Sequence, residues 1–122
     1  MAIHFTTRID GALLRVEAHG FDESLEEVMA YGSALIDLCL THQLTRVLCD
    51  ERALEYRLNT LDTYALATWI SEQVPHLARI ALVSAPAAAA DAQFWENVAV
   101  NRGLTVRAFQ DPAAAEHWLC ER

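Results

Sequence analysis

The sequence predicts an α/β fold: a mixed sheet that begins with a β-hairpin and continues in the order β-β-α-β-α-β-α-β-α. Two observations lead to this prediction. Asp10-Gly11 lies between two alternating apolar and polar runs, which is a strong hairpin signal. The last third of the chain has the pattern of strand, helix, strand and helix, as in parallel sheets with crossover helices. We expect one domain over residues 1–122, a length that suits a single core.

The hairpin strands are expected at residues 3–7 and 13–18, with Gly20 ending the second. A helix follows from about residue 23 to 42, where Ser24 and Glu27 have capping-box spacing and Asp22 is an equally good cap. Gly32 lies inside this helix at a cost of about 1 kcal/mol relative to alanine, so we expect a close approach to the sheet there. The expected core face consists of Leu25, Val28, Met29, Gly32, Leu35, Ile36 and Cys39.

The middle of the chain predicts a short buried strand at residues 45–50, which ends at Asp50. Residues 51–58 are polar and are expected to form an irregular loop. A second helix is expected from the cap at residues 59–62 to about Val74, and Pro75 stops it. Its expected inward residues are Leu61, Ala65, Trp69 and Ile70.

The remaining elements alternate between strand and helix. Residues 79–84 are nearly all apolar, as in a strand covered on both faces. After it, residues 84–90 either open a helix or form a loop before Asp91, and the sequence leaves both open. Gly103 is expected to close the helix over 91–103. A strand at 105–109 and a last helix at 111–119, opened by Asp111-Pro112, complete the fold.

Composition excludes several classes of partner. The net charge is −8 and all nine basic residues are arginine, so we expect no nucleic-acid binding, which needs a basic surface. No apolar run approaches the ~20 residues of a membrane span, so no membrane insertion is expected. The N-terminal residues lack the pattern of a secretion signal. Together with three cysteines and no CxxC pair, this predicts a cytoplasmic protein with buried thiols at Cys39 and Cys49.

Motifs of known chemistry are absent from the sequence. The five histidines have no metal-ligand spacing, Ser84 lacks a GxSxG context, and no glycine-rich loop follows a strand. We therefore expect no enzyme activity, no metal and no cofactor.

Packing and capping patterns of one known family occur at residues 47–50, Phe94, 97–103, 106–109 and 115–119. These segments resemble the STAS domain superfamily, the SpoIIAA-like or anti-anti-sigma-factor fold, and in particular its small stand-alone bacterial STAS/SEC14-like proteins. The resemblance covers essentially the whole chain and implies a regulatory module that acts through protein contact. Its family motif, an Asp-Ser-Ser-Gly-like sequence with a phosphorylated serine, is missing, since residues 58–62 read Leu-Asn-Thr-Leu-Asp and Thr60 supplies the only hydroxyl. Asp50 matches the aspartate that ends this strand in the family pattern.

Two groups of residues are candidate sites. Asn59 and Thr60 form either an ordinary helix N-cap or a position for phosphorylation or anion contact. Asp50, Tyr56 and Arg57 belong to a charged segment after a parallel strand, where open α/β sheets bind ligands. That segment is either a solvated loop or a docking surface with Tyr56 and the arginines as anchors.

The resulting functional prediction is a non-catalytic regulatory or interaction module of the STAS type with a protein partner. The alternative is a binder of a small apolar or anionic ligand, such as a lipid or a nucleotide. A homodimer is also expected, because an edge strand and an outward aromatic residue, Trp95 or its neighbour Phe94, favour self-association.

Overall fold

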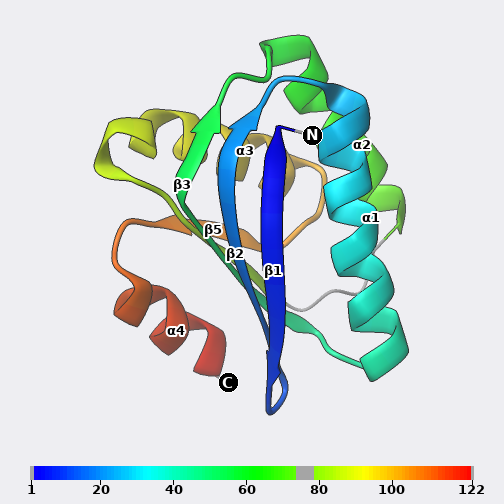
Figure 1. Ribbon diagram of the computed structural model, residues 1–122, viewed down its shortest axis with the longest axis vertical. Helices are drawn as coiled ribbons and strands as arrows, with labels where there is room; N and C mark the ends of the chain where they lie inside the picture. Colours follow the sequence, from blue (N-terminus) through cyan, green and yellow to red (C-terminus); the bar gives the residue numbers. More distant parts are fainter. Residues whose placement is uncertain (1, 74–78, 122) are drawn as a thin grey trace.

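The computed structural model describes residues 2–73 and 79–121, which form a five-stranded sheet in the order β1-β2-β3-β4-β5 (Figure 1). The hairpin of β1 and β2 is antiparallel, and β3, β4 and β5 follow in parallel. The predicted α/β class and element order are therefore confirmed. The strands are β1 (Ile3–Asp10), β2 (Leu13–Asp22), β3 (Arg46–Tyr56), β4 (Arg79–Val83) and β5 (Val106–Phe109).

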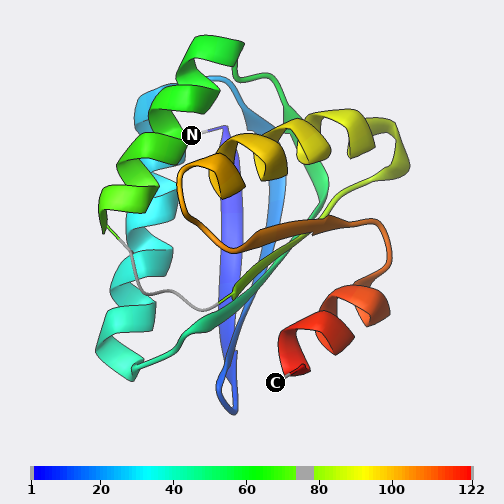
Figure 2. The same ribbon diagram turned by 180° about the vertical axis from the view of Figure 1, so that it is seen from behind.

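Helices cover both faces of the sheet unequally. The helices α1 (Leu25–His42), α2 (Thr60–Gln73) and α3 (Ala89–Asn101) pack on one face around the larger core. The helix α4 (Pro112–Cys120) packs alone on the other face against β3, β4 and β5, which Figure 2 shows from behind. None of the described helices is long and apolar enough to cross a membrane.

The prediction that Gly20 ends the second strand is wrong, because β2 continues to Asp22. Gly20 has a φ of +102°, and a Cβ at this position would lie 1.9 Å from the carbonyl oxygen of Ala2. Phe21 N donates to that same oxygen at 3.1 Å. The glycine is therefore needed for the close approach of the N-terminal segment, and it does not interrupt the strand.

The predicted irregular loop over residues 51–58 is also wrong, because β3 runs on to Tyr56 beside the extended β2. The pairing shifts on the way: Glu17 pairs with Asp50, whereas His19 pairs with Ala53. Between these two pairs β3 advances by three residues and β2 by only two. The extra residue in β3 forms a β-bulge. Bulges redirect the side chains around them, and this one lies at the pocket described below.

The first helix begins as predicted, with Ser24 Oγ accepting from Glu27 N at 3.3 Å. The expected approach of Gly32 to the sheet is wrong. A Cβ on Gly32 would lie 3.4 Å from Cζ3 of Trp69, so the glycine makes room for α2 instead.

The second helix is capped by Asn59, whose Oδ1 accepts from Asp62 N at 2.8 Å. Its predicted inward face is partly wrong, because Leu61 is 80% exposed and Ala65 is also exposed. The buried residues are instead Thr63, Leu66 and Ala67, whereas Trp69 and Ile70 are half-buried as part of the larger core. The predicted stop at Pro75 lies outside the described residues.

The structure decides between the two alternatives for residues 84–90. A short 3₁₀ turn (Pro86–Ala88) precedes α3, which begins at Ala89, two residues before the predicted start. The predicted end of α3 is confirmed by Gly103, which follows it with a φ of +87°. The predicted cap of α4 is confirmed too, since Asp111 Oδ1 accepts from Ala113 N at 3.1 Å.

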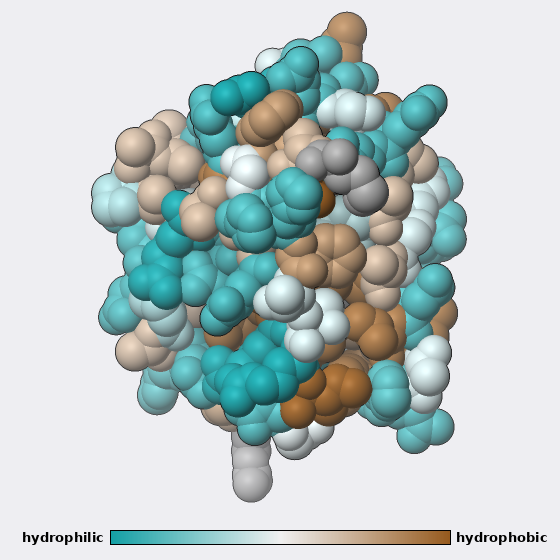
Figure 3. All heavy atoms as spheres, in the orientation of Figure 1, coloured by the Kyte–Doolittle hydropathy of each residue, from teal (hydrophilic) through white to brown (hydrophobic). Residues whose placement is uncertain are grey.

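The surface shows where the fold leaves apolar groups uncovered. On the face drawn in Figure 3, hydrophilic side chains predominate, and apolar ones gather between β1 and the lower half of α1. Among the described residues, the large hydrophobic side chains that are exposed are Ile9, Leu40, Leu61, Tyr64, Phe94 and Val100.

Candidate functional site

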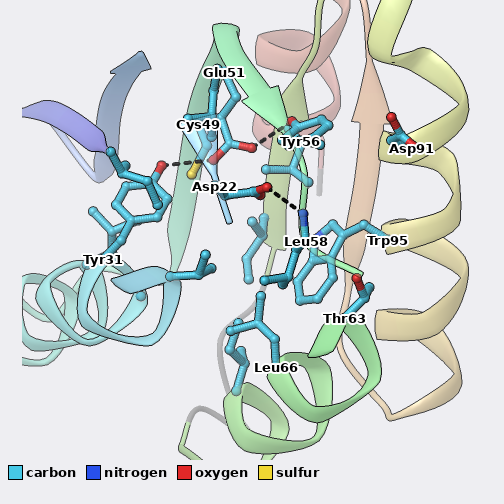
Figure 4. A pocket seen from close by; sticks show the side chains of 18 of the residues that line it. Asp22, Tyr31, Cys49, Glu51, Tyr56, Leu58, Thr63, Leu66, Asp91 and Trp95 are labelled. Atoms are coloured by element: carbon cyan, nitrogen blue, oxygen red, sulfur yellow. Dashed lines mark hydrogen bonds between the residues drawn. The ribbon is translucent and has the colours of Figure 1, made fainter. Parts of the chain in front are cut away.

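A pocket of about 240 Å³ lies between the helical face of the sheet and α1, α2 and α3 (Figure 4). Its wall is mainly aliphatic, with contributions from all three helices and from β3 and β4. Thr60, Asp91 and Phe94 are the exposed members of the lining, so the pocket opens between the start of α2 and the start of α3. The apolar wall includes Val28, Leu35, Ile36, Leu54, Leu66, Ile70, Leu82 and Trp95.

One buried carboxyl group, that of Glu51 at the β-bulge, forms the polar end of this pocket. Tyr31 Oη donates to Glu51 Oε2 at 2.9 Å, and Tyr56 Oη donates to Glu51 Oε1 at 2.7 Å. The first tyrosine comes from α1 and the second from the end of β3, so the carboxyl group links helix and sheet. Glu51 is only 5% exposed.

Burial raises the pKa of the Glu51 carboxyl to about 7. The two tyrosine hydrogen bonds stabilise the charged form and lower the pKa, but burial outweighs them. The carboxylates of Asp22 and Asp50 raise the pKa of Glu51 further. Near neutral pH this group therefore exchanges a proton between a neutral and a charged form.

The neighbouring hydroxyl and thiol groups stay protonated. Burial, and then the charge of Glu51, raises the pKa of both Tyr31 and Tyr56. Burial also raises the pKa of the Cys49 thiol well above its ordinary value. A thiol held in its neutral form is a poor nucleophile, so these groups are suited to hydrogen bonding rather than to covalent chemistry.

A second carboxyl group, that of Asp22, lies at the end of β2. Its Oδ1 accepts from Arg57 N at 2.6 Å and from Leu58 N at 3.0 Å, and so fixes the turn between β3 and α2. Burial raises the pKa of Asp22, and these two hydrogen bonds offset part of the rise. Asp22 was expected as a possible cap of α1, but Ser24 has that role.

The structure divides the predicted site residues among different places. Tyr56 and Thr60 line the pocket, whereas Asn59 caps α2 behind it. Asp50 lies within β3 and not at its end, between Cys49 and Glu51, which line the pocket. Its side chain lines a different pocket, which Pro112 at the start of α4 also lines, and pairs with Arg52 at 2.7 Å.

Arg57 lies outside the pocket, on the surface. Its guanidinium group stacks over the Phe21 ring at 4.0 Å and pairs with Glu55 at 2.9 Å and with Glu23 at 3.4 Å. These exposed ion pairs contribute little to stability.

Sequence reasoning placed Glu51 in the charged segment considered as a docking surface, not in a buried site, and it did not identify Tyr31, Asp22 or Cys49 as site residues. One signal was present: Val47, Cys49 and Glu51 alternate, so a longer strand would have placed Glu51 on the buried face. The bulge that brings Leu54 and Tyr56 to the same face has no comparable signature in the sequence.

The raised pKa of Glu51 predicts a pH-dependent stability. The folded state favours the neutral carboxyl, so the stabilisation is complete below about pH 4.5, declines above it and is lost once the pH passes about 7. The free energy of unfolding should therefore fall by roughly 3 kcal/mol across this window relative to Glu51→Gln, which does not titrate. Urea unfolding at several pH values measures this difference.

The matched control is Glu26→Gln, which removes the same charge from an exposed position on α1. The free energy of unfolding of this variant should change with pH as that of the wild type does. A constant difference between wild type and Glu51→Gln from pH 4.5 to 8 would contradict the assignment.

Comparison with known proteins identifies the fold. No protein-family model matches the sequence, and no curated protein matches it. Among solved structures, the chain is similar to an uncharacterised protein of the DUF3478 family with a SpoIIAA-like fold from Shewanella loihica PV-4. The two share 17% sequence identity and superpose with a TM-score of 0.58, over 98% of this chain and 94% of the other. At this identity the likeness concerns the fold: the chain has a SpoIIAA-like fold, as the sequence predicts.

Proposed function

We propose that this chain is a non-catalytic binding module whose ligand is a small, mainly apolar molecule held in the pocket beside Glu51. The observation that carries the proposal is the pocket itself, a space of about 240 Å³ within the larger core. Protein interiors rarely leave voids larger than a water molecule. Apolar side chains that face such a space lose the contacts that a filled core would give them. A ligand bound in the pocket would supply the missing contacts.

The volume limits the size of the ligand. An apolar cavity of roughly 150 Å³ holds a benzene molecule, so this pocket has room for a substituted ring or a short hydrocarbon chain. It is smaller than the roughly 300 Å³ at which sites for drug-sized molecules begin. The size therefore favours a small apolar molecule over a diacyl lipid or a dinucleotide.

Binding without catalysis agrees with the chemistry of the lining. The thiol of Cys49 and the hydroxyls of Tyr31 and Tyr56 remain protonated because burial raises their pKa values. The Glu51 carboxyl is engaged by both tyrosines. These groups can orient a ligand by hydrogen bonds, which is how pockets of this kind gain specificity.

A small apolar probe, and a substitution that fills the pocket with a larger side chain, test this proposal. Ethylbenzene, a neutral apolar probe, should bind the wild type with a Kd of about 1 mM or below and raise its melting temperature. Leu58→Trp, which places a larger side chain in the pocket wall, should abolish binding. Ligand-observed NMR and thermal unfolding measure both effects.

The matched control is Leu40→Trp, the same change at a position that is 69% exposed on α1 and outside the pocket. This variant should bind ethylbenzene as the wild type does. Equal binding by the Leu58→Trp variant would show that the probe binds elsewhere, and no binding by the wild type would refute the proposal.

A second candidate function is protein contact of the STAS regulatory type, and one surface favours it. Leu61, Tyr64 and Phe94 are exposed on α2 and α3. The rings of Tyr64 and Phe94 meet edge to face at 6.0 Å, and Arg102 lies 4.9 Å from the Tyr64 ring centre. Aromatic and arginine side chains are enriched at protein interfaces. Because Phe94 also lines the pocket, a partner here would sense whether the pocket is filled.

Phosphorylation of Thr60 would be the switch in this second function. Thr60 is exposed in the first turn of α2, where the helix dipole favours negative charge. Incubation with ATP and a lysate of the source organism should place a phosphate on Thr60, as detected by tandem mass spectrometry. Thr60→Val should remain unmodified. An unmodified wild-type Thr60 would count against the switch and would leave the pocket proposal intact.

The homodimer, the cytoplasmic location and the single domain over residues 1–122 remain predictions. The edge position of β1, most of whose residues are exposed, supports pairing with a second copy. Gel filtration that shows only monomer would contradict the homodimer. The unpaired thiols of Cys39 and Cys49 agree with a reducing compartment.

A further inference from the structure

The charges around the pocket have one sign. Its lining includes the carboxyl groups of Glu51, Asp22 and Asp91, and no arginine, lysine or histidine is among the described lining residues. The chain as a whole carries a net charge of −8. An anionic ligand would therefore enter a negative field with no cation to balance it.

The hydrogen-bonding groups at the polar end are nearly all acceptors. Tyr31 and Tyr56 each use their hydroxyl proton on Glu51, so only their oxygen lone pairs are free. Each oxygen of ionised Glu51 accepts one of these bonds and can accept another. At Asp22, Oδ1 accepts two backbone bonds, while Oδ2 has no partner among the described residues. A ligand that completes these bonds must donate.

We propose that the physiological ligand is a small organic amine, whose ammonium group is bound by Glu51 and Asp22 and whose apolar body fills the aliphatic part of the pocket. An ammonium group offers three donors and one positive charge, which match the free acceptors and the negative field. This inference rests on the proposed binding function and specifies its ligand class. It excludes the anionic ligand that the sequence left open.

Binding of the amine is coupled to a proton. In the empty pocket near neutral pH, a large share of Glu51 is neutral, since its pKa is about 7. When the ammonium binds to a neutral Glu51, the carboxyl proton leaves to solvent and the ion pair forms. The titratable groups that interact with Glu51 are Asp22 from β2, Cys49 and Asp50 from β3, and the two tyrosines. Asp91 from α3 lines the same pocket.

Three probes with the same phenyl body test the proposal on the wild-type protein at pH 8. These are 2-phenylethylamine, 2-phenylethanol and phenylacetate. Isothermal titration calorimetry should show the amine binding at least tenfold more tightly than the alcohol, and no binding of phenylacetate. The affinity for the amine should fall about tenfold between pH 8 and pH 6, and that for the alcohol should not change.

Two variants test whether Glu51 causes the preference for the amine. Glu51→Gln keeps one oxygen that can accept from one tyrosine, and its NH₂ group can donate to the hydroxyl oxygen of the other. It removes the negative charge, so the ratio of amine affinity to alcohol affinity should fall at least tenfold. Glu26→Gln, the exposed control on α1, should change neither. The comparison of the three probes on the wild type stands even if Glu51→Gln does not fold.

The possible failures are distinguishable. Equal binding of the amine and the alcohol, or tight binding of phenylacetate, would overturn the amine proposal and leave the pocket's binding function standing. Amine binding that is unchanged in Glu51→Gln would overturn it as well. If neither these probes nor ethylbenzene bound the wild type, both proposals would fail.

Discussion

The structure of the pocket depends on one interaction: the carboxyl group of Glu51 held between the hydroxyls of Tyr31 and Tyr56 inside an apolar core. A carboxyl group without hydrogen-bond partners would be costly to bury there, and a charged one costlier still. The two hydroxyls reduce this cost, and the raised pKa lets the group become neutral. The same arrangement ties α1 to β3 and fixes the polar end of the space between them.

The bulge in β3 explains how Glu51 and Tyr56 reach the same face of the sheet. In a regular strand, Glu51 would face the same side as residues 49 and 53, and Leu54 and Tyr56 would face the other. The extra residue between Asp50 and Ala53 brings Glu51, Leu54 and Tyr56 to the helical face together. The bulge is a local irregularity in the sheet, and the pairing of β2 with β3 resumes beyond it, where Gly20 pairs with Leu54.

The fold was predictable because its signals are local. The Asp10-Gly11 turn, the capping residues Ser24 and Asp111, and Gly103 after α3 each act within a few residues, and the structure confirms them. Apolar periodicity placed most of α1 as well. The inward face of α2 was harder to predict from the sequence, because it depends on how that helix packs against α1 and α3. This packing leaves Leu61 exposed.

The site was less predictable because it is built from distant residues. Glu51 was read as part of a polar loop, and only the pairing of β3 with the extended β2 makes it a buried strand residue. Tyr31 lies twenty residues earlier in the chain, on a helix face that looks like ordinary core. Tyr56 was singled out as an anchor on a docking surface, yet it lines the pocket.

The most direct measurement is the titration of Glu51 itself, followed through its side-chain carbonyl carbon by ¹³C NMR in the wild-type protein. The account predicts a midpoint near pH 7, with the chemical shift of the Tyr31 and Tyr56 ring carbons changing at the same pH. A midpoint near 4.5, the ordinary value for a glutamate, would mean that the carboxyl group is not buried as described, and would contradict the account.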